Sequence, residues 1–246
     1  MTLRERLSAG DRVVGTVINI ADPAVAELMS AEWDLVWIDR EHGAVGRKEA
    51  QDILVGAAAA GTPALIRVSG CDSPEIGSSL DAGAHGVVIP NVRSADEARR
   101  ALSRVAFPPT GSRGVGARRL GMLRSRGVEI EPLVMMQIET AAGVDASGAI
   151  SSLDGVGALV VGTSDLSADL GVTPDAPDVA RAVGVVSAAA ERSGIPWGVA
   201  GGDAGVLAGL AGRAGQIMMV STDLRIIAAA VASKVGEIRS ALDAGG

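Results

Sequence analysis

The chain alternates short runs rich in Val, Ile and Leu with longer Ala-rich amphipathic segments, a pattern typical of parallel β/α units. The expected strands span eight segments: 13–20, 35–39, 64–68, 86–90, 133–139, 158–162, 196–200 and 217–222. The expected helices also span eight segments: 23–31, 47–60, 74–82, 94–105, 144–152, 178–193, 204–213 and 224–242. Eight such units within 246 residues match a (β/α)8 TIM barrel. We therefore expect an α/β fold with one barrel domain over residues 1–246.

A doubly wound sheet is the main alternative for this alternation, and it usually carries a Gly-rich phosphate loop after its first strand. The corresponding segment here reads INIADPAV (18–25), which favours the barrel. The connection from 106 to 132 exceeds the usual length of about 2 to 6 residues. Its prolines, glycines and arginines predict a shaped loop with a short helix behind it.

Composition excludes several classes of partner. The formal net charge is -7 and like charges do not cluster, which argues against nucleic acid and anionic membranes and for a small-molecule substrate.

The single cysteine cannot form an internal disulfide, and no apolar stretch approaches the roughly 20 residues needed to span a bilayer. The first residues, MTLRERLSAGDR, lack the apolar core of a signal peptide. We expect a cytoplasmic protein.

Two carboxylates follow neighbouring expected strands. Glu139 closes the run 133–139, and Asp165 lies just past the run 158–162. Barrel strand ends commonly carry ligands and catalytic groups. Two carboxylates without clustered His or Cys favour a hard ion such as Mg²⁺ or Mn²⁺, with water or substrate oxygens completing its coordination. Spacing alone equally allows both carboxylates to cap the helices that follow.

Strand alternation predicts which polar side chains meet at the barrel mouth. Residues two apart share a face, so Gln137 and Glu139 point the same way. Arg67 and Asp39 are each the last inward-facing residue of an expected strand. Their side chains would therefore converge with Asp165 at one rim of the barrel. The planar guanidinium of Arg67 suits a carboxylate or a 2-oxo oxygen.

The positions of the histidines and lysines limit which catalytic mechanisms have a candidate residue. His42 follows a strand, close to Asp39, and a carboxylate there could orient its ring as a general base. His85 precedes its strand and belongs to the opposite end of a barrel. The lysines, Lys48 and Lys234, end no strand, so a Schiff-base mechanism has no good candidate.

Six segments in order resemble the HpcH/HpaI aldolase family of metal-dependent class II pyruvate aldolases. They are WDLVWIDREHG (33–43), ALIRV (64–68), LDAGAHGVVIPNVRSADEAR (80–99), PPTGSRGVG (108–116), MQIET (136–140) and DGVGALVVGTSDLSADLG (154–171). The resemblance implies a TIM barrel whose C-terminal helix is exchanged between subunits. It also implies a homo-oligomer, a trimer or more usually a hexamer.

By this resemblance the metal ligands fall on Glu139 and Asp165, with Mg²⁺ or Mn²⁺ expected and Co²⁺ as a further candidate. The catalytic histidine falls on His42, and the substrate-binding, enolate-stabilising arginine falls on Arg67. The family's histidine partner corresponds to Asp81. Asp39 is also placed to orient the ring, so both aspartates remain candidates.

The turn after the sixth expected strand would bind the pyruvate carboxylate through backbone amides. Its residues are Gly162, Thr163 and Ser164, and Gln137 is a further expected substrate-binding residue. This turn reads GTSDLS where the family often has GPADLS. The segment 117–132 is also shorter than in aldolases of this family and lacks their aromatic residues, so the aldehyde preference and the subunit interface are expected to differ from theirs.

The resemblance implies a carbon-carbon lyase. It would cleave a 4-hydroxy-2-oxo acid reversibly to pyruvate and an aldehyde through a metal-stabilised pyruvate enolate. One alternative is an acyl-CoA lyase of the citrate lyase β-subunit type. Another is a barrel that binds a 2-oxo acid without turning it over.

Overall fold

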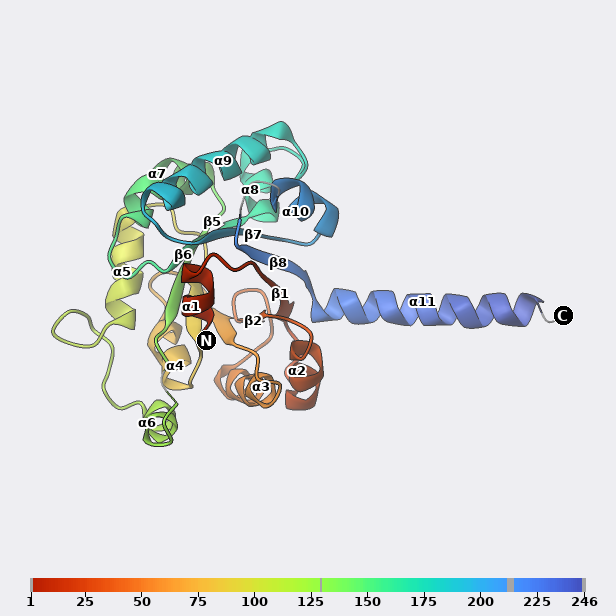
Figure 1. The fold of residues 1–246 in the computed structure, drawn as a ribbon, viewed down its shortest axis with the longest axis horizontal. Coiled ribbons are helices and arrows are strands. Elements are labelled where there is room, and N and C mark those ends of the chain that lie inside the picture. Colours follow the sequence, from red (N-terminus) through yellow and green to blue (C-terminus); the bar gives the residue numbers. More distant parts are fainter. Residues whose placement is uncertain (1, 129, 212–214, 245–246) are drawn as a thin grey trace.

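The computed structural model describes residues 2–128, 130–211 and 215–244, and its strands form one closed barrel (Figure 1). Eight parallel strands follow one another in chain order, and β8 pairs with β1 to close the barrel. They are β1 (Val13–Ile18), β2 (Leu35–Asp39), β3 (Ala64–Arg67), β4 (Gly86–Ile89), β5 (Leu133–Ile138), β6 (Ala158–Gly162), β7 (Trp197–Gly201) and β8 (Ile217–Thr222). This architecture confirms the predicted TIM barrel.

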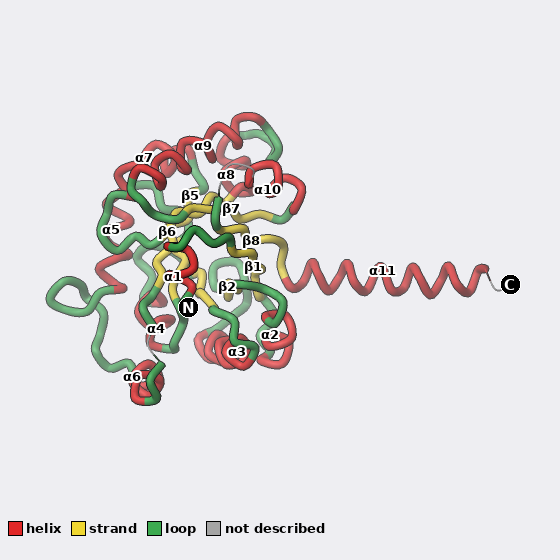
Figure 2. Tube along the Cα trace, in the orientation of Figure 1, coloured by secondary structure: helices red, strands yellow, loops and turns green. Residues whose placement is uncertain are grey.

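Helices surround the strands, as Figure 2 shows in red around yellow. They are α1 (Leu3–Ser8), α2 (Pro23–Ser30), α3 (Arg47–Ala59), α4 (Glu75–Asp81), α5 (Ala95–Val105), α6 (Arg118–Ser125), α7 (Ala141–Ser151), α8 (Thr163–Leu170), α9 (Pro177–Arg192), α10 (Ala204–Ala211) and α11 (Asp223–Ala244). The short helix predicted in the long connection is α6. The sequence pattern does not predict α1 or α8. Thr2 and Glu5 form a capping box that starts α1, whereas α8 begins directly at the end of β6.

The barrel interior is an apolar core that α1 closes at its amino-terminal end. Its buried strand residues are Val13, Leu35, Trp37, Leu65, Val88, Leu133, Met135, Ala158, Val160, Ile217 and Met219. Leu3 and Leu7 of α1 belong to the same cluster and are almost fully buried. Gln216 donates a hydrogen bond of 2.7 Å to the Leu7 carbonyl, which joins α1 to the start of β8. The end of the barrel opposite α1 is therefore the one open to a ligand.

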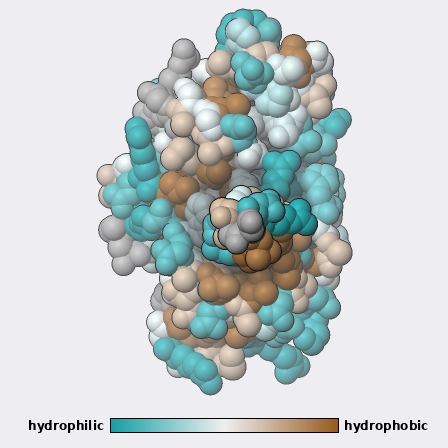
Figure 3. All heavy atoms as spheres, turned by 90° about the vertical axis from the view of Figure 1, so that its right-hand side faces the viewer, coloured by the Kyte–Doolittle hydropathy of each residue, from teal (hydrophilic) through white to brown (hydrophobic). Residues whose placement is uncertain are grey.

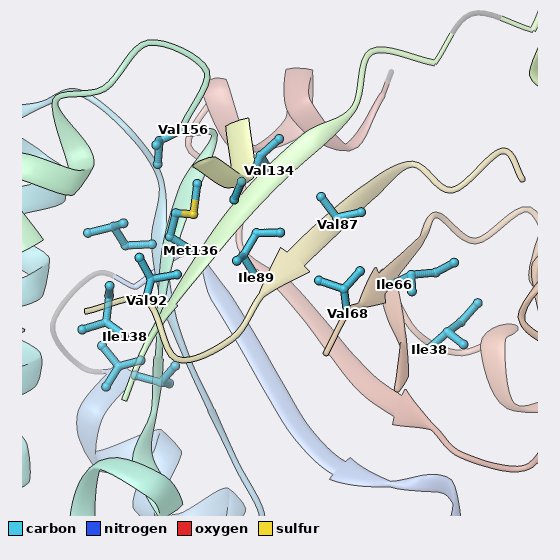
Figure 4. Packing of buried hydrophobic residues seen from close by; sticks show 14 of the residues in the cluster. Ile38, Ile66, Val68, Val87, Ile89, Val92, Val134, Met136, Ile138 and Val156 are labelled. Carbon is cyan, nitrogen blue, oxygen red and sulfur yellow. The ribbon is translucent and has the colours of Figure 1, made fainter. Parts of the chain in front are cut away.

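The other face of the same strands packs against the helices. Figure 4 shows Ile38, Ile66, Val87 and Met136, which come from consecutive strands and belong to this outer core. Successive strand residues point to opposite faces, so residues on either side of Ile38 point into the barrel. This alternation, read from the sequence, directs the polar strand ends into the mouth.

Helix α11 leaves the barrel after β8 and extends away from it for 22 residues (Figure 1). Exposed apolar side chains recur along it every three or four residues. They are Leu224, Ile227, Val231, Val235, Ile238 and Leu242. An apolar helical stripe of this kind normally packs against another apolar surface. None of the helices in the described part of the chain is long and apolar enough to cross a membrane.

Candidate functional site

A cavity of about 270 Å³ lies at the carboxyl ends of the strands. It brings together most residues that the sequence analysis selected, on a floor that includes Trp37 and Met219. The predicted site residues among its lining are His42, Arg67, Gln137, Gly162, Ser164 and Asp165. Of the other candidates, Asp39 and Glu139 are buried directly behind this lining, as their contacts show.

Asp39 and Arg67 form a two-pronged ion pair across β2 and β3. The Arg67 Nε and Nη2 atoms donate to the two Asp39 carboxylate oxygens at 3.0 and 2.8 Å. Both side chains are largely buried, with 4% of Asp39 and 13% of Arg67 exposed. Burial alone would raise the pKa of Asp39, but the guanidinium holds that pKa below its usual range. The pair fixes the guanidinium in one orientation at the cavity wall.

The turn after β2 carries Glu41 and His42. Asp39 accepts the backbone N–H groups of Glu41 at 3.1 Å and His42 at 3.3 Å, so it shapes the turn and does not contact the imidazole. The imidazole Nε2 instead lies 3.7 Å from a Glu41 carboxylate oxygen, and the His42 side chain is 64% exposed. Burial raises the pKa of Glu41, against the opposing charge of Arg67. Glu41 is thus the carboxylate that faces the imidazole.

Glu139 is a buried carboxylate at the end of β5. One of its oxygens accepts the backbone N–H of Asn91 at 2.7 Å, and the other accepts from the amide of Gln137. Asn91 has a left-handed backbone, with φ of 53°, that few non-glycine residues adopt. Burial raises the pKa of Glu139 to about 7, and the nearby negative charges of Asp165 and Glu41 add to this rise. Within the described ranges no ion pair joins this carboxylate to a basic side chain, and the nearby charge of Arg67 does not offset its burial.

Asp165 lies in the first turn of α8, close to Glu139. Gly162, at the end of β6, packs against Glu139 and Gln137, and the space there does not admit a side chain at position 162. A Cβ at position 162 would lie 2.5 Å from a Glu139 carboxylate oxygen and 2.8 Å from the Gln137 amide nitrogen. No side chain caps α8, and Ser164 in its first turn lines the cavity, whereas Thr163 is buried beside it with its hydroxyl donating to the Ala200 carbonyl.

The alternative that these carboxylates are helix caps does not fit. Thr140 caps α7 through its hydroxyl, which accepts the Gly143 N–H at 3.1 Å, while Glu139 bonds elsewhere. The N-cap of α8 is Gly162, and Asp165 makes no capping hydrogen bond.

The residues present fit a divalent cation. Glu139 and Asp165 supply oxygen ligands, and the Gln137 Oε1 atom is buried without a hydrogen-bond partner. A hard ion would satisfy that oxygen and offset the raised pKa of Glu139. Among the described residues no group of three or more His, Cys, Asp or Glu side chains forms a metal cluster. An ion here would therefore keep several positions for water or substrate, as Mg²⁺ commonly does.

Asp81 is not brought to the site within this chain. It ends α4, and both Nε and Nη2 of Arg113 donate to one of its oxygens, at 3.1 and 2.7 Å. Because α4 runs back from the carboxyl end of β3, its last residue lies toward the amino-terminal end of the barrel. Within one chain, Asp39 is the aspartate near His42, and it contacts the backbone.

The histidine and lysines set aside by sequence lie outside the cavity. His85 directly precedes β4, where its Nδ1 accepts the Ala64 N–H at 3.3 Å and burial lowers its pKa. Lys48 pairs with Asp52 on the exposed side of α3. Lys234 lies far along α11 beside Glu237.

Sequence reasoning did not identify the cavity wall built by β7, β8 and α11. Gly201, Gly202, Ser221, Thr222 and Arg225 line it. Ser221 has a φ of 60°, and it and Asn91 are the non-glycine residues with positive φ in the described chain. Such backbone strain is concentrated at functional sites, yet a Ser or Asn in a sequence does not reveal it.

A closed β/α barrel with paired charges at the carboxyl ends of its strands is the arrangement of a barrel enzyme. A family model described as HpcH/HpaI aldolase/citrate lyase matches residues 17–230. The chain belongs to this family.

Individual relatives agree with this assignment. The chain is 33% identical to a hydroxypyruvate/pyruvate aldolase from Sagittula stellata, over 94% of this chain and 95% of the relative. It is 33% identical to a 4-hydroxy-2-oxo-heptane-1,7-dioate aldolase from Salmonella typhimurium, over 73% and 72%. A crystal structure of an HpcH/HpaI aldolase/citrate lyase family protein from Burkholderia cenocepacia superposes with a TM-score of 0.87 at 30% identity, over 96% of this chain and 98% of the other.

Proposed function

We propose that this protein is a divalent-metal-dependent pyruvate aldolase that cleaves a 4-hydroxy-2-oxo acid reversibly to pyruvate and an aldehyde. The observation that carries the proposal is the buried Glu139, beside Asp165 and the unpartnered oxygen of Gln137, across the mouth from the Asp39–Arg67 pair. The aldolases among its relatives support the same reaction class.

Glu139 and Asp165 would hold the cation, with Mg²⁺ or Mn²⁺ as the first candidates and Co²⁺ as a third. When bound, the ion supplies a Lewis acid for the 2-oxo group and charge for the developing enolate. Because the pKa of Glu139 is near neutrality, a proton and the cation compete for the same carboxylate.

The backbone amides that open α8 at Thr163 and Ser164 bind the carboxylate of the 2-oxo acid, as helix N-termini bind anions. Arg67 lies across the cavity, held by Asp39 so that its guanidinium needs no reorganisation when negative charge appears on the substrate oxygen.

His42 removes the proton of the 4-hydroxyl group. The C4–O bond then becomes a carbonyl, the C3–C4 bond breaks, and its electron pair remains on the pyruvate half as an enolate that takes a proton at C3. In the aldol direction His42 returns the proton to the new alkoxide. Glu41, 3.7 Å from the imidazole, stabilises the ring when it is protonated.

We further propose that α11 is exchanged between subunits of a homo-oligomer, a trimer or hexamer. Its exposed apolar stripe has no cover within the described chain, and Figure 3 shows further apolar surface around the base of this helix. Light scattering is expected to give a multiple of the chain mass. Changing Val231 and Ile238 on the stripe to Glu is expected to release smaller species. Ser233→Glu with Ser240→Glu, on the opposite face of the same helix, is the charge-matched control.

Pyruvate release from a panel of 4-hydroxy-2-oxo acids, with and without chelator, tests the proposed reaction. We expect activity that chelation abolishes and Mg²⁺ or Mn²⁺ restores. Glu139→Gln should remove activity and weaken metal binding in a folded barrel, whereas Glu191→Gln on exposed α9 should not. Activity that survives complete metal removal would contradict the proposal. Turnover of CoA thioesters alone would select the acyl-CoA lyase, and 2-oxo acid binding without turnover would select the binding barrel.

A further inference from the structure

Arg40 directly follows β2 and lies in the turn that carries His42. Its side chain is largely buried, with 11% exposed. The Arg40 Nε atom donates to the Val45 carbonyl oxygen at 3.1 Å, and its Nη2 atom lies 2.8 Å from a carboxylate oxygen of Glu75, the first residue of α4. Arg40 therefore spans the turn and ties it to the start of α4.

Glu75 also holds the loop that follows β3. Its second carboxylate oxygen accepts the Ser69 N–H at 3.1 Å, shortly after Arg67 in the chain. Because β2 and β3 are neighbours in the barrel, one carboxylate joins the two connections that carry the proposed base, His42, and the proposed enolate-stabilising cation, Arg67.

The turn that carries His42 has little support of its own. No backbone–backbone hydrogen bond in the described chain involves residues 41–45. Asp39 holds one side of the turn through the N–H groups of Glu41 and His42. The His42 side chain is 64% exposed, so packing does not fix the imidazole. The position of the imidazole therefore depends on the side chains that hold the backbone of the turn.

A second ion pair nearby shows what is particular about Arg40 and Glu75. Arg100 of α5 pairs with Asp72, but these side chains are 49% and 58% exposed, and such exposed pairs hold a structure only weakly. The Arg40–Glu75 pair is largely buried, and each further hydrogen bond of its charged groups goes to the backbone of a connection at the barrel mouth. A pair of this kind fixes one geometry of both connections.

We infer that Arg40 and Glu75 form a positioning pair that holds His42 in place relative to Arg67 for proton transfer. This inference rests on the proposed aldolase function and adds positioning residues to it. Both residues lie outside the cavity lining, so the pair acts through the turn. A general base must lie within hydrogen-bond reach of the proton that it removes. A displaced turn should therefore slow the chemical step and leave binding at the ends of β5 and β6 unchanged.

Arg40→Gln and Glu75→Ala test the inference with the 4-hydroxy-2-oxo acid that the wild type cleaves fastest. Calorimetric titration with Mn²⁺ counts the intact cation sites per chain, and kcat is expressed per site. We expect kcat per site to fall roughly 10- to 100-fold in both variants, as misplaced catalytic groups do, while KM and the Mn²⁺ affinity keep their wild-type values. Arg100→Gln, which breaks the exposed ion pair, should keep all three values.

The double variant Arg40→Gln/Glu75→Ala distinguishes a pair from two independent residues. Residues that act as one unit should lose no more kcat per site together than the more severe single variant loses. Losses that multiply would overturn the inference. Fewer Mn²⁺ sites with an unchanged kcat per site would overturn it as well, because a pair that only stabilises the fold would have that effect.

Amide hydrogen exchange separates failure of the inference from failure of the proposed function. If no metal supports cleavage of any 4-hydroxy-2-oxo acid, the aldolase proposal fails, but exchange still tests the pair. Residues 40–46 should exchange faster in Arg40→Gln and Glu75→Ala, while the barrel strands keep their protection and Arg100→Gln keeps the wild-type rate in this turn. Wild-type exchange of residues 40–46 in both pair variants would overturn the inference, whatever the activity.

Discussion

The two sides of the cavity differ in the number of charged side chains that line them and in how firmly those side chains are held. The charged side, from β2, β3, β5 and β6, holds Asp39, Glu41, Arg67, Glu139 and Asp165, and hydrogen bonds fix Asp39, Arg67 and Glu139 in place. The glycine side, from β7, β8 and the start of α11, offers Gly201, Gly202 and one unpaired arginine, Arg225. Fixed charges suit a chemical step that is common to all substrates. An open wall with a single charge suits selection among them.

The largest expected effect is on the charged side, at Arg67. Arg67→Gln should lower kcat/KM about 100- to 1000-fold for every substrate, the cost of one oxyanion-stabilising donor. It also leaves the buried Asp39 unpaired, which should destabilise the fold by roughly 3 kcal/mol. In the double variant Asp39→Asn/Arg67→Gln, denaturant unfolding should show most of this stability restored while activity stays low. Activity that returns with stability would show that the pair is structural.

The next largest effect is on the pH dependence of the free energy of unfolding, measured with a chelator present so that no metal binds Glu139. The pKa of Glu139 is about 7 in the folded state, against 4.5 for a glutamate side chain free in water, so between these pH values the folded state binds a proton that the unfolded state has lost. Its contribution to the free energy of unfolding is present below pH 4.5 and falls by roughly 3 kcal/mol as pH rises through 7. Unfolding curves from pH 4.5 to 8 should show this slope in the wild type and lose it in Glu139→Gln. Parallel curves would mean that Glu139 titrates normally.

A smaller effect is expected when a glycine on each side of the cavity is changed to alanine, and this pair of variants compares the two sides directly. Gly162→Ala places a methyl group against Glu139 and Gln137, and should weaken metal binding about 10- to 100-fold, as second-layer changes commonly do. Gly202→Ala should leave metal affinity unchanged, because its methyl group meets the Arg225 guanidinium and neither proposed metal ligand. Metal titration of both variants checks the contrast. Equal losses of metal affinity would remove the distinction between the sides.

Sequence reasoning predicts the charged side well because hydrophobic alternation determines both the strands and the face of each residue. Strands 35–39, 158–162 and 217–222 have the expected bounds. The first strand ends at Ile18, two residues earlier than predicted, because the next two N–H groups bind Asp223, a residue 204 positions from Asn19. No local pattern reveals such a contact.

The glycine side was not predicted, again because its residues are brought together by contacts between distant parts of the sequence. A lone arginine at the start of a helix looks like any solvated charge, and its neighbour Gly202 is brought to it only by the pairing of β7 with β8. The segment that forms α8 resembles a turn, because it lacks a side-chain cap and begins directly after a strand. Asp81 satisfies a sequence motif, yet the chain pairs it with Arg113, 32 positions away.

The seal that α1 forms at the amino-terminal end also bears on how the protein is synthesised. Leu7 and Val13 both bond to Gln216, and β1 pairs with β8, so α1 and β1 dock on a strand that is synthesised about 200 residues later. Until β8 emerges, β1 remains an open sheet edge and the apolar face of α1 has no cover. Nascent chains that stall before residue 217 should therefore aggregate or recruit chaperones more than any partly made helical bundle of this length.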